Sequence, residues 1–389
     1  MTVEFISALN VRPGDELNPV PGTGLDVDYL NRYARTLEEA GFDYTLVAYG
    51  SRSFDAFTVA ATVAANTETI KPIVALRPNI VFPTVAAQSL ATLDQLSHGR
   101  AVVHIISGGS DAEQKRQGDY LGKDERYARS AEYLDILRKS WTSEEAFSHE
   151  GKYYKFEDFG PGFPTYNGGN IPISLGGSSD AAYAAGGAAD IFGLWGEPLK
   201  DTQDQIDKIY ASSDALGRET KPRIWVTFRP IVAPTDELAW EKAAKVLDTL
   251  ENVYKGGQLS SWFGNFARPN SGPENVGSQR LLEIASRKDV HDRALWTPTA
   301  TATGAAGAST ALVGSYETVA AAILDYVDLG ADLISIRGYD NLNDAIDYGR
   351  YVLPLVRQEL AHREATGRRG EIVAQPPLAQ DELSVGASA

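Results

Sequence analysis

Short apolar runs alternate with longer amphipathic runs along most of this chain, and this alternation restricts the fold more than any other feature. Residues 26–40 repeat apolar side chains at helical spacing, and Gly41 follows where the helix is expected to end. The runs at residues 3–9 and 44–48, on either side, are short and mainly apolar. Strands buried on both faces of a parallel sheet have this composition. The pattern therefore predicts parallel strands separated by helices.

The alternation continues towards the end of the chain and amounts to about eight strand–helix repeats. We expect strands at residues 3–9, 44–48, 71–77, 101–107, 173–175, 191–194, 224–232 and 333–336, and helices at residues 26–40, 54–65, 84–96, 131–141, 181–188, 202–216, 237–254 and 343–360. Eight repeats predict an α/β fold of the closed (β/α)8 type, a TIM barrel. A doubly wound open sheet is the competing fold.

Two long stretches interrupt the alternation. Residues 108–170, with a small hairpin at 147–156, form an insertion after the fourth strand, and residues 255–312 form one after the seventh. We therefore expect a single barrel domain over residues 1–364. The tail, residues 365–389, contains Pro, Gly and Arg and is expected to be either disordered or an arm for oligomerisation.

The end of the second insertion, residues 297–309, consists almost wholly of Thr, Ala, Gly, Pro and Ser. Such a segment is not expected to anchor itself by burying apolar side chains. At the C-terminal face of a barrel it could act as a mobile lid that closes over a site. A plain flexible loop is the alternative interpretation.

Composition excludes several classes of function. The formal net charge of −16 argues against a nucleic-acid partner and against docking on an anionic membrane. No run of apolar residues is long enough to span a membrane, and the N-terminal residues lack the pattern of a signal peptide, so we expect a cytoplasmic protein. The 389 residues include no cysteine, and the five histidines are scattered, so no metal site is expected. Demanding chemistry would then depend on an organic cofactor.

Small residues at two expected strand ends are candidates for a cofactor site. Gly177, Ser178 and Ser179 follow one strand and open a helix, where backbone N–H groups can accept a phosphate. A tight turn with a capping serine is an equally good interpretation of these three residues. His104 and Ser107 lie at the end of the 101–107 strand and point to opposite sides of it.

His104 could hydrogen-bond a flat heterocycle in the mouth of the barrel. The competing interpretation is a core histidine whose hydrogen bonds are satisfied by the protein. Tyr127 follows in the first insertion, within Glu-Arg-Tyr at residues 125–127. Its hydroxyl is a good phosphate donor, although the same triplet could form a salt bridge at a helix start beside a packed ring.

Several motifs occur together, in order, between about residue 30 and residue 356. They are ALRP at 75–78, PTVAAQ at 83–88, ATLDQLSHGR at 91–100, DERY at 124–127, SAEY at 130–133, LGGSSD at 175–180, WGEP at 195–198, TALVG at 310–314 and GY at 338–339. This set closely resembles the alkanesulfonate monooxygenases of the bacterial-luciferase-like group of flavin-dependent enzymes.

The resemblance implies a barrel that binds reduced FMN (FMNH2) delivered by a separate NAD(P)H-dependent flavin reductase. Molecular oxygen would then form a flavin (hydro)peroxide that oxygenates a small organic substrate. It places phosphate contacts on Tyr127, Ser178 and Ser179, beside Gly177. A homodimer or homotetramer is also implied.

By the same resemblance, ring contacts fall near His104 and Ser107, and the substrate side falls on Trp195 and Tyr339.

The chain departs from its desulfonating relatives at the substrate side. They carry Arg-x-His on the seventh strand, where this chain has Thr227, Phe228 and Arg229, and an arginine in the mobile loop that has no counterpart between residues 297 and 312. A sulfonate requires charge-assisted donors. We therefore carry over the cofactor chemistry, with Trp195, Arg229 and Tyr339 as catalytic candidates, and leave the substrate open, organosulfur compounds included. A deazaflavin (F420)-dependent oxidoreductase and a non-catalytic flavin-binding protein are the alternatives.

Overall fold

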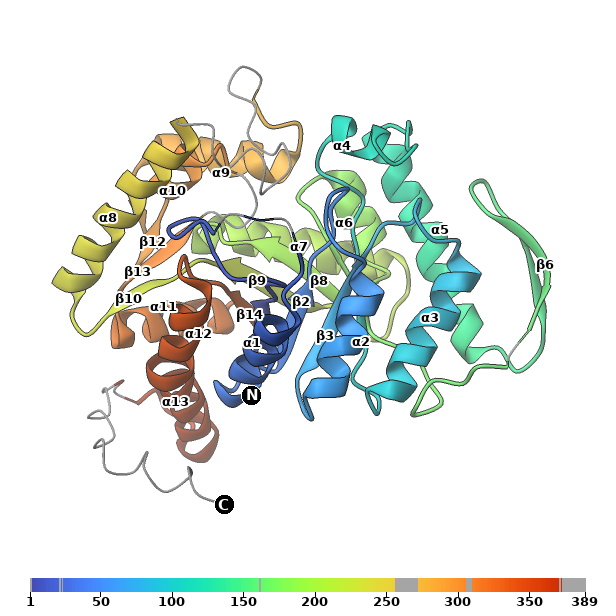
Figure 1. The fold of residues 1–389 in the computed structure, drawn as a ribbon, viewed down its shortest axis with the longest axis horizontal. Helices are drawn as coiled ribbons and strands as arrows, with labels where there is room; N and C mark the ends of the chain where they lie inside the picture. Colours follow the sequence, from blue (N-terminus) through green and yellow to red (C-terminus); the bar gives the residue numbers. More distant parts are fainter. Residues whose placement is uncertain are drawn as a thin grey trace.

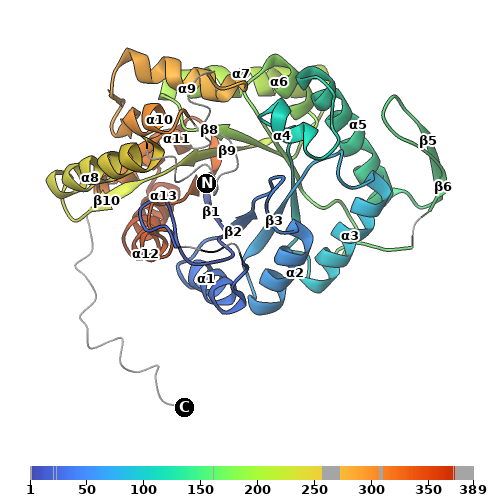
Figure 2. The ribbon, with the colours of Figure 1, turned by 45° about the horizontal axis from the view of Figure 1, so that its top comes forward.

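Eight parallel strands close into a barrel in a computed structural model of the chain, which describes residues 2–20, 22, 24–160, 162–255, 272–305, 310–370 and 372 (Figures 1 and 2). In the order of the chain the barrel strands are β1 (Glu4–Ala8), β2 (Tyr44–Val47), β3 (Lys71–Leu76), β4 (Val102–Ile105), β7 (Ile173–Gly176), β8 (Ile191–Trp195), β9 (Arg223–Phe228) and β14 (Ala331–Ile336). The closed order β1-β14-β9-β8-β7-β4-β3-β2 confirms the predicted barrel and excludes the open sheet.

Helices surround the barrel and cover the outward-facing side chains of the strands (Figure 2). They are α1 (Val27–Glu39), α2 (Ala56–Asn66), α3 (Pro83–Leu96), α5 (Lys123–Thr142), α6 (Asp180–Gly186), α7 (Leu199–Ala215), α11 (Tyr316–Asp328), α12 (Asn341–Asp347) and α13 (Leu353–Thr366). A short π-helical turn, η2 (Tyr348–Val352), joins the last two. In the part of the chain that the structure describes, no helix is long and apolar enough to cross a membrane.

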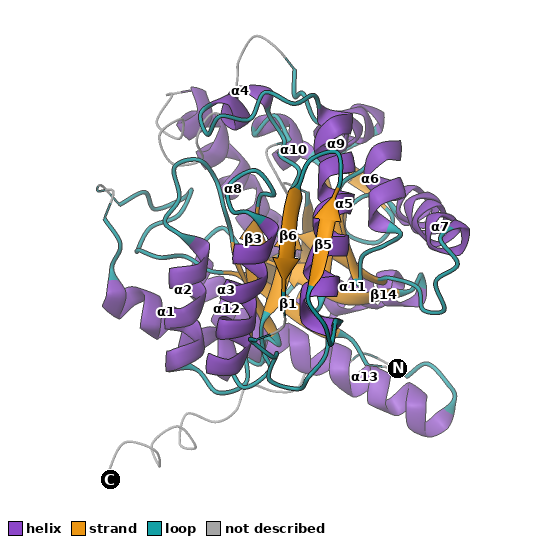
Figure 3. Ribbon diagram, turned by 90° about the vertical axis from the view of Figure 1, so that its right-hand side faces the viewer, coloured by secondary structure: helices purple, strands orange, loops and turns teal. Residues whose placement is uncertain are grey.

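The two predicted insertions follow β4 and β9, the fourth and seventh barrel strands. The first holds the short helix α4 (Asp111–Lys115), helix α5, and an antiparallel hairpin of β5 (Phe147–Glu150) and β6 (Lys155–Phe159) that stands outside the helix ring (Figures 1 and 3). The second is larger than the predicted 255–312: besides α9 (Val276–Arg287) and α10 (Pro298–Ala302), it includes α8 (Asp236–Lys255), which was predicted as a barrel helix, and a four-stranded sheet that begins at residue 231. The strands of that sheet, in spatial order, are β10 (Ile231–Ala233), β13 (Ala311–Ser315), β12 (Leu295–Trp296) and β11 (Val290–His291).

Three expectations about individual elements are wrong. The strand expected at residues 224–232 is divided at Arg229 and Pro230, because proline lacks the N–H that a central strand must donate. The helix expected at 131–141 begins at Lys123. Helix α11, which lies between β13 and β14 in the chain, was not predicted.

The Thr/Ala/Gly segment at residues 297–309 also differs from expectation. Thr299, Ala300 and Ala305 are buried, so the described part up to residue 305 is anchored by small side chains that pack closely. The Thr303 hydroxyl donates to the carbonyl of Thr299 at 2.7 Å, which satisfies a polar group within this packing. Residues 306–309 lie outside the described part, as does most of the predicted tail, including residues 373–389.

One layer of large side chains fills the barrel interior. Seven of the eight strands contribute to it, with Ile6, Tyr44, Ile73, Val102, Ile191, Trp225 and Leu333. Because side chains alternate along a strand, residues two positions nearer the C-terminal end of each strand face the mouth of the barrel above this layer. The layer therefore forms the floor of any site at the mouth.

Below this layer an ionic cluster closes the N-terminal end of the barrel. The Glu4 carboxylate accepts from Lys71 Nζ at 2.9 Å, from Arg223 Nη2 at 2.5 Å and from the Tyr44 hydroxyl at 3.1 Å. Burial raises the pKa of Glu4, but the hydrogen bonds and charges of Lys71 and Arg223 outweigh it, and the pKa lies below its usual value. The cluster thus joins four strands through one carboxylate.

Replacement of Glu4 by Gln should lower the free energy of unfolding by about 1–3 kcal/mol at pH 7, since two cations lose their counter-charge. A carboxylate whose pKa is lowered on folding contributes stability above its unfolded pKa, and this contribution is lost as the pH falls. The difference between wild type and Glu4→Gln in chemical denaturation should therefore shrink below pH 4.5. Glu241→Gln, at an exposed position of α8, is the control, and an equal effect of both substitutions at pH 7 would contradict the role of the cluster.

Candidate functional site

Small side chains line the mouth of the barrel around His104. Register pairs Ala75 with His104 and His104 with Ser174, and it pairs Gly176 with Gly193 on the next two strands. A Cβ atom on Gly176 would lie 3.5 Å from His104 Cε1, and one on Gly193 would lie 3.8 Å from it. The two glycines therefore leave the space beside the imidazole unfilled by their own side chains, as a flat ligand requires.

His104 is held as a neutral imidazole. Its Nδ1 lies 2.9 Å from the Ser174 hydroxyl, and its ring centroid is 5.2 Å from that of Trp225 in the interior layer. Burial lowers the pKa of His104 to about 4. At neutral pH the ring can thus exchange hydrogen bonds with a ligand but carries no charge.

Ser107 faces the opposite way, as its position in the strand predicts. Its hydroxyl lies 2.9 Å from the hydroxyl of Ser130 on α5, and its carbonyl accepts from Arg126 Nε at 2.8 Å. Arg126 also donates to the carboxylate of Asp111 at 2.8 Å. These bonds tie the end of β4 to both helices of the first insertion, and the expected ring contact of Ser107 stays a prediction.

Tyr127 meets the backbone of the glycine turn after β7. Its hydroxyl donates to the carbonyl of Gly176 at 3.2 Å, and burial raises its pKa to about 12, so it remains a donor throughout the physiological range. Gly177 has a φ of 144°, and a Cβ there would lie 2.3 Å from the Tyr127 hydroxyl and 2.7 Å from Ala182 Cβ. Only glycine permits this approach.

The two serines after Gly177 have different surroundings. The Ser179 hydroxyl caps α6 by accepting from the N–H of Ala182 at 3.3 Å. The structure therefore gives Ser179 the capping role that the sequence left open, and its contact with a phosphate stays a prediction. Ser178 lies beside the first turn of α9, because a Cβ on Gly277 would be 3.4 Å from its hydroxyl oxygen.

Trp195 ends β8 at the same place. The Gly277 Cβ position lies 3.4 Å from Trp195 Cε3, and the indole packs against the buried side chains of Leu281, Ala300 and Ala305. Trp195 is only partly buried. The predicted phosphate side and the predicted substrate side thus adjoin each other beneath α9.

Arg229 and Tyr339 lie deeper than the predicted substrate side implies. The Arg229 guanidinium donates to both carboxylate oxygens of Glu16, at 2.9 and 3.0 Å, and to the carbonyl of Gly338 at 2.8 Å. It also lies over the Tyr339 ring, 3.8 Å from the centroid. Both side chains are buried, and burial raises the pKa of Tyr339. Direct contact of either with a substrate stays a prediction.

The sequence analysis missed two acidic residues near the mouth of the barrel that pair with arginines. Glu16, from the loop after β1, receives Arg337 at 3.2 Å in addition to Arg229, and these cations hold its pKa below the usual value despite burial. Glu197 follows Trp195 and pairs with Arg280 of α9. Glu197 stands inside the quoted WGEP motif and could have been selected from it. Glu16 lies in a loop without periodicity, where nothing signals its partner.

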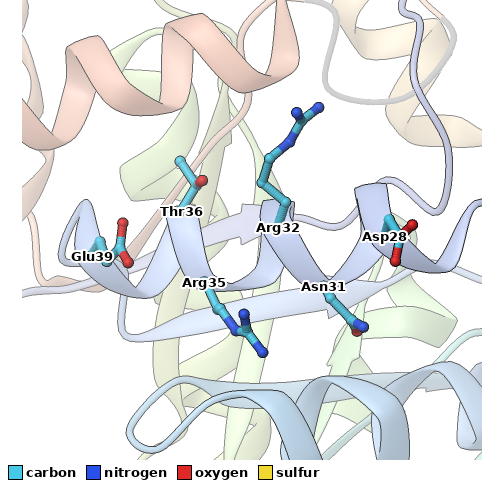
Figure 4. A pocket seen from close by; sticks show the side chains of 6 residues that line it. All are labelled: Asp28, Asn31, Arg32, Arg35, Thr36 and Glu39. Atoms are coloured by element: carbon cyan, nitrogen blue, oxygen red, sulfur yellow. The ribbon is translucent and has the colours of Figure 1, made fainter. Parts of the chain in front are cut away.

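A groove on the outer surface of α1 is not a competing site. Figure 4 shows its lining, the side chains of Asp28, Asn31, Arg32, Arg35, Thr36 and Glu39. All six come from one helix and are spread along it, so they do not converge on a ligand. In the described part of the chain, no group of three or more His, Asp or Glu side chains could hold a metal ion.

A family model described as luciferase-like monooxygenase matches residues 4–333. Among solved structures, the riboflavin lyase RcaE, determined with modified FMN and riboflavin, matches with a TM-score of 0.72 and 20% identity over 97% of this chain and 94% of its own. The EDTA monooxygenase EmoA from Chelativorans sp. BNC1 matches with a TM-score of 0.72 and 19% identity over 92% and 94%. An F420-dependent secondary alcohol dehydrogenase matches with a TM-score of 0.65 and 16% identity over 92% and 100%.

Substitution of His104 by Asn should remove a pH dependence of stability. A histidine with a pKa of about 4 when folded and 6.5 when unfolded takes up its proton on unfolding between these values, so stability falls as the pH falls through this range. At pH 5 the wild-type protein should lose on the order of 2 kcal/mol relative to pH 7.5 from this residue alone.

The measurement is chemical denaturation at both pH values. His98→Asn, at an exposed position, is the matched control and should leave the loss in place. If His104→Asn shows the same loss as the wild type, His104 is not buried as a neutral ring.

Proposed function

This chain belongs to the luciferase-like monooxygenase family, and from that membership we propose that it is a two-component monooxygenase. It would take reduced FMN from a separate NAD(P)H-dependent flavin reductase and use molecular oxygen to oxygenate a small organic substrate. The observation that carries the proposal is the contact of the Tyr127 hydroxyl with the backbone at Gly176 and Gly177, next to Ser178.

The residues at this place fit the phosphate end of FMN. Gly177 has no Cβ, so the backbone of the turn is accessible, and the Ser178 hydroxyl lies beside it. The Tyr127 hydroxyl would donate to the phosphate by turning its single hydrogen away from the Gly176 carbonyl. Arg126, adjacent to Tyr127, is engaged by Asp111 and by backbone carbonyls, so phosphate binding would rely on hydroxyl and backbone donors. Gly176, Gly193 and His104 are the residues that would hold its tricyclic ring.

When bound, reduced FMN would supply the two electrons that activate oxygen. The contribution of the chain itself is to bind, orient and exclude water. Neutral His104 offers a hydrogen bond without introducing a charge, and Trp195, packed under α9, covers the site from one side. Exclusion of water by these side chains would favour productive oxygenation over loss of reactive species to solvent.

For the substrate we propose a small organic molecule, with organosulfur compounds and sulfonates as the first class to test. The cluster of Arg229, Arg337 and Glu16 carries two positive charges and one negative charge at adjacent strand ends. We also propose a cytoplasmic homodimer or homotetramer.

The test of this function is oxygen consumption by the purified chain with FMN, NADH and a flavin reductase, with a substrate panel added in turn. Substrate-dependent oxygen uptake above that of the reductase alone supports a monooxygenase. Hydride transfer from reduced F420 without oxygen uptake would instead support a deazaflavin-dependent oxidoreductase, for which the structural likeness to an F420-dependent alcohol dehydrogenase is the motivation. FMN binding without either activity would indicate a non-catalytic flavin-binding protein.

Loss of the Tyr127 hydroxyl should weaken reduced-FMN binding. Tyr127→Phe removes one hydrogen bond to a charged phosphate, worth about 1.5–3 kcal/mol, so the dissociation constant should rise about 10- to 100-fold in anaerobic titration. Ser178→Ala should act in the same direction. Tyr120→Phe makes the same chemical change at an exposed tyrosine of the same insertion and should bind like the wild type. Equal affinities of Tyr127→Phe and Tyr120→Phe would refute this placement of the phosphate.

Trp195→Ala should impair turnover rather than the binding of reduced FMN. It removes a ring from the proposed substrate side, so turnover should fall while reduced FMN still binds. Steady-state oxygen uptake at saturating FMN measures the first quantity, and anaerobic titration measures the second. A loss of FMN affinity as large as that of Tyr127→Phe would place Trp195 on the cofactor instead.

A further inference from the structure

Helix α9 and the residues just before it contact Ser178, Trp195 and the first insertion within one short segment. Its first turn lies against Ser178 and Trp195 through Gly277. Just before it, the Glu274 carboxylate accepts from the N–H of Asp111 at 2.7 Å. The helix therefore lies next to the proposed cofactor site, and Figure 1 shows it above the barrel strands, between α10 and α4.

One buried ion pair fastens α9 to the barrel. Arg280 donates through Nε to Glu197 Oε1 at 2.9 Å and through Nη2 to Glu197 Oε2 at 2.5 Å, a two-bond arrangement. The Glu197 side chain is 1% exposed and the Arg280 side chain 27%. A carboxylate buried to this degree needs its cation, because the loss of one partner leaves an uncompensated charge.

The backbone of Glu197 is itself held in place by hydrogen bonds. The Glu197 carbonyl accepts from the Tyr326 hydroxyl at 2.7 Å and from the Thr202 hydroxyl at 3.0 Å, so helices α11 and α7 both hold this backbone. Glu197 also lies two residues after Trp195 on the same strand end. The backbone segment that carries Trp195 therefore also carries the residue that anchors α9.

A second ion pair on the same face of α9 differs in exposure. Arg287, two helical turns after Arg280, bonds Asp201 at 3.1 Å, but its side chain is 45% exposed. Exposed pairs of this kind contribute little because water competes for both charges. The two arginines therefore form a matched comparison between a buried and an exposed attachment.

We propose that Glu197 and Arg280 are a positioning pair that docks α9 over the cofactor site, so that flavin binding and α9 docking are coupled. The inference rests on the proposed function, since it takes the ligand between Ser178 and Trp195 to be reduced FMN. Neither charged side chain acts on the ligand directly. The pair acts through Gly277, which it holds against Ser178 and Trp195.

The experiment measures amide hydrogen–deuterium exchange of residues 276–287 in the wild-type chain, with and without reduced FMN under anaerobic conditions. Coupling predicts that FMN slows exchange in α9, as well as in the turn at residues 176–179. Protection of the turn without any change in α9 would overturn the inference and leave the proposed function intact. No FMN binding at all would overturn the proposed function and the inference together.

Variants then test the ion pair itself. Arg280→Gln should weaken reduced-FMN binding at least about tenfold and speed exchange in α9, whereas Arg287→Gln should stay within about twofold of the wild type. Arg280→Lys keeps the charge but loses the two-bond geometry and should recover part of the affinity. Wild-type affinity in Arg280→Gln, or equal losses in the Arg280 and Arg287 variants, would contradict a positioning role. If Arg280→Gln does not fold, the wild-type exchange experiment still decides the question.

Discussion

Alternation of side chains along eight parallel strands, fixed in register by closure of the barrel, determines what can lie at its mouth. The interior layer at Trp225 and its neighbours fills the space inside the barrel, so a ligand can be faced only by inward-facing positions nearer the C-terminal ends of the strands. At those positions the chain places His104, Ser174, Gly176 and Gly193 on three adjacent strands. The two glycines carry no Cβ atoms, so their own side chains leave the space beside the imidazole unfilled.

Buried ion pairs then attach the irregular segments to this rigid frame. Arg77 pairs with Glu113 of the first insertion, Arg229 with Glu16 of the loop after β1, and Glu197 with Arg280 of the second insertion. Each pair has one member at a strand end. Such pairs contribute little net stability because both charges must be desolvated, but breaking one is costly, so they select one arrangement of the loops. Loops that lack apolar residues of their own can be ordered in this way.

The regular elements were predictable from the sequence, and the reasons are local. Apolar periodicity identified the eight strands to within a few residues, because a strand covered on both faces has few polar positions. The failures come from long-range contacts. Small threonines and alanines at residues 297–305 are anchored by close packing that no local pattern reveals. Glu16 and Arg229 are 213 residues apart, and their pairing exists only in the folded chain. Tyr127 and Gly177 could be selected from motifs, but their contact could not be derived from spacing.

The pKa values of His104 and Tyr127 indicate which part of the chemistry these side chains can perform. His104 stays neutral because burial lowers its pKa, and Tyr127 stays protonated because burial raises its pKa. Both are therefore constant donors or acceptors across neutral pH and are poorly suited to move a proton during turnover, which requires a pKa near the working pH. Their chemistry is that of binding and orientation. Electron transfer to oxygen would consequently belong to the cofactor, and the chain would contribute by holding it beside Trp195, next to α9.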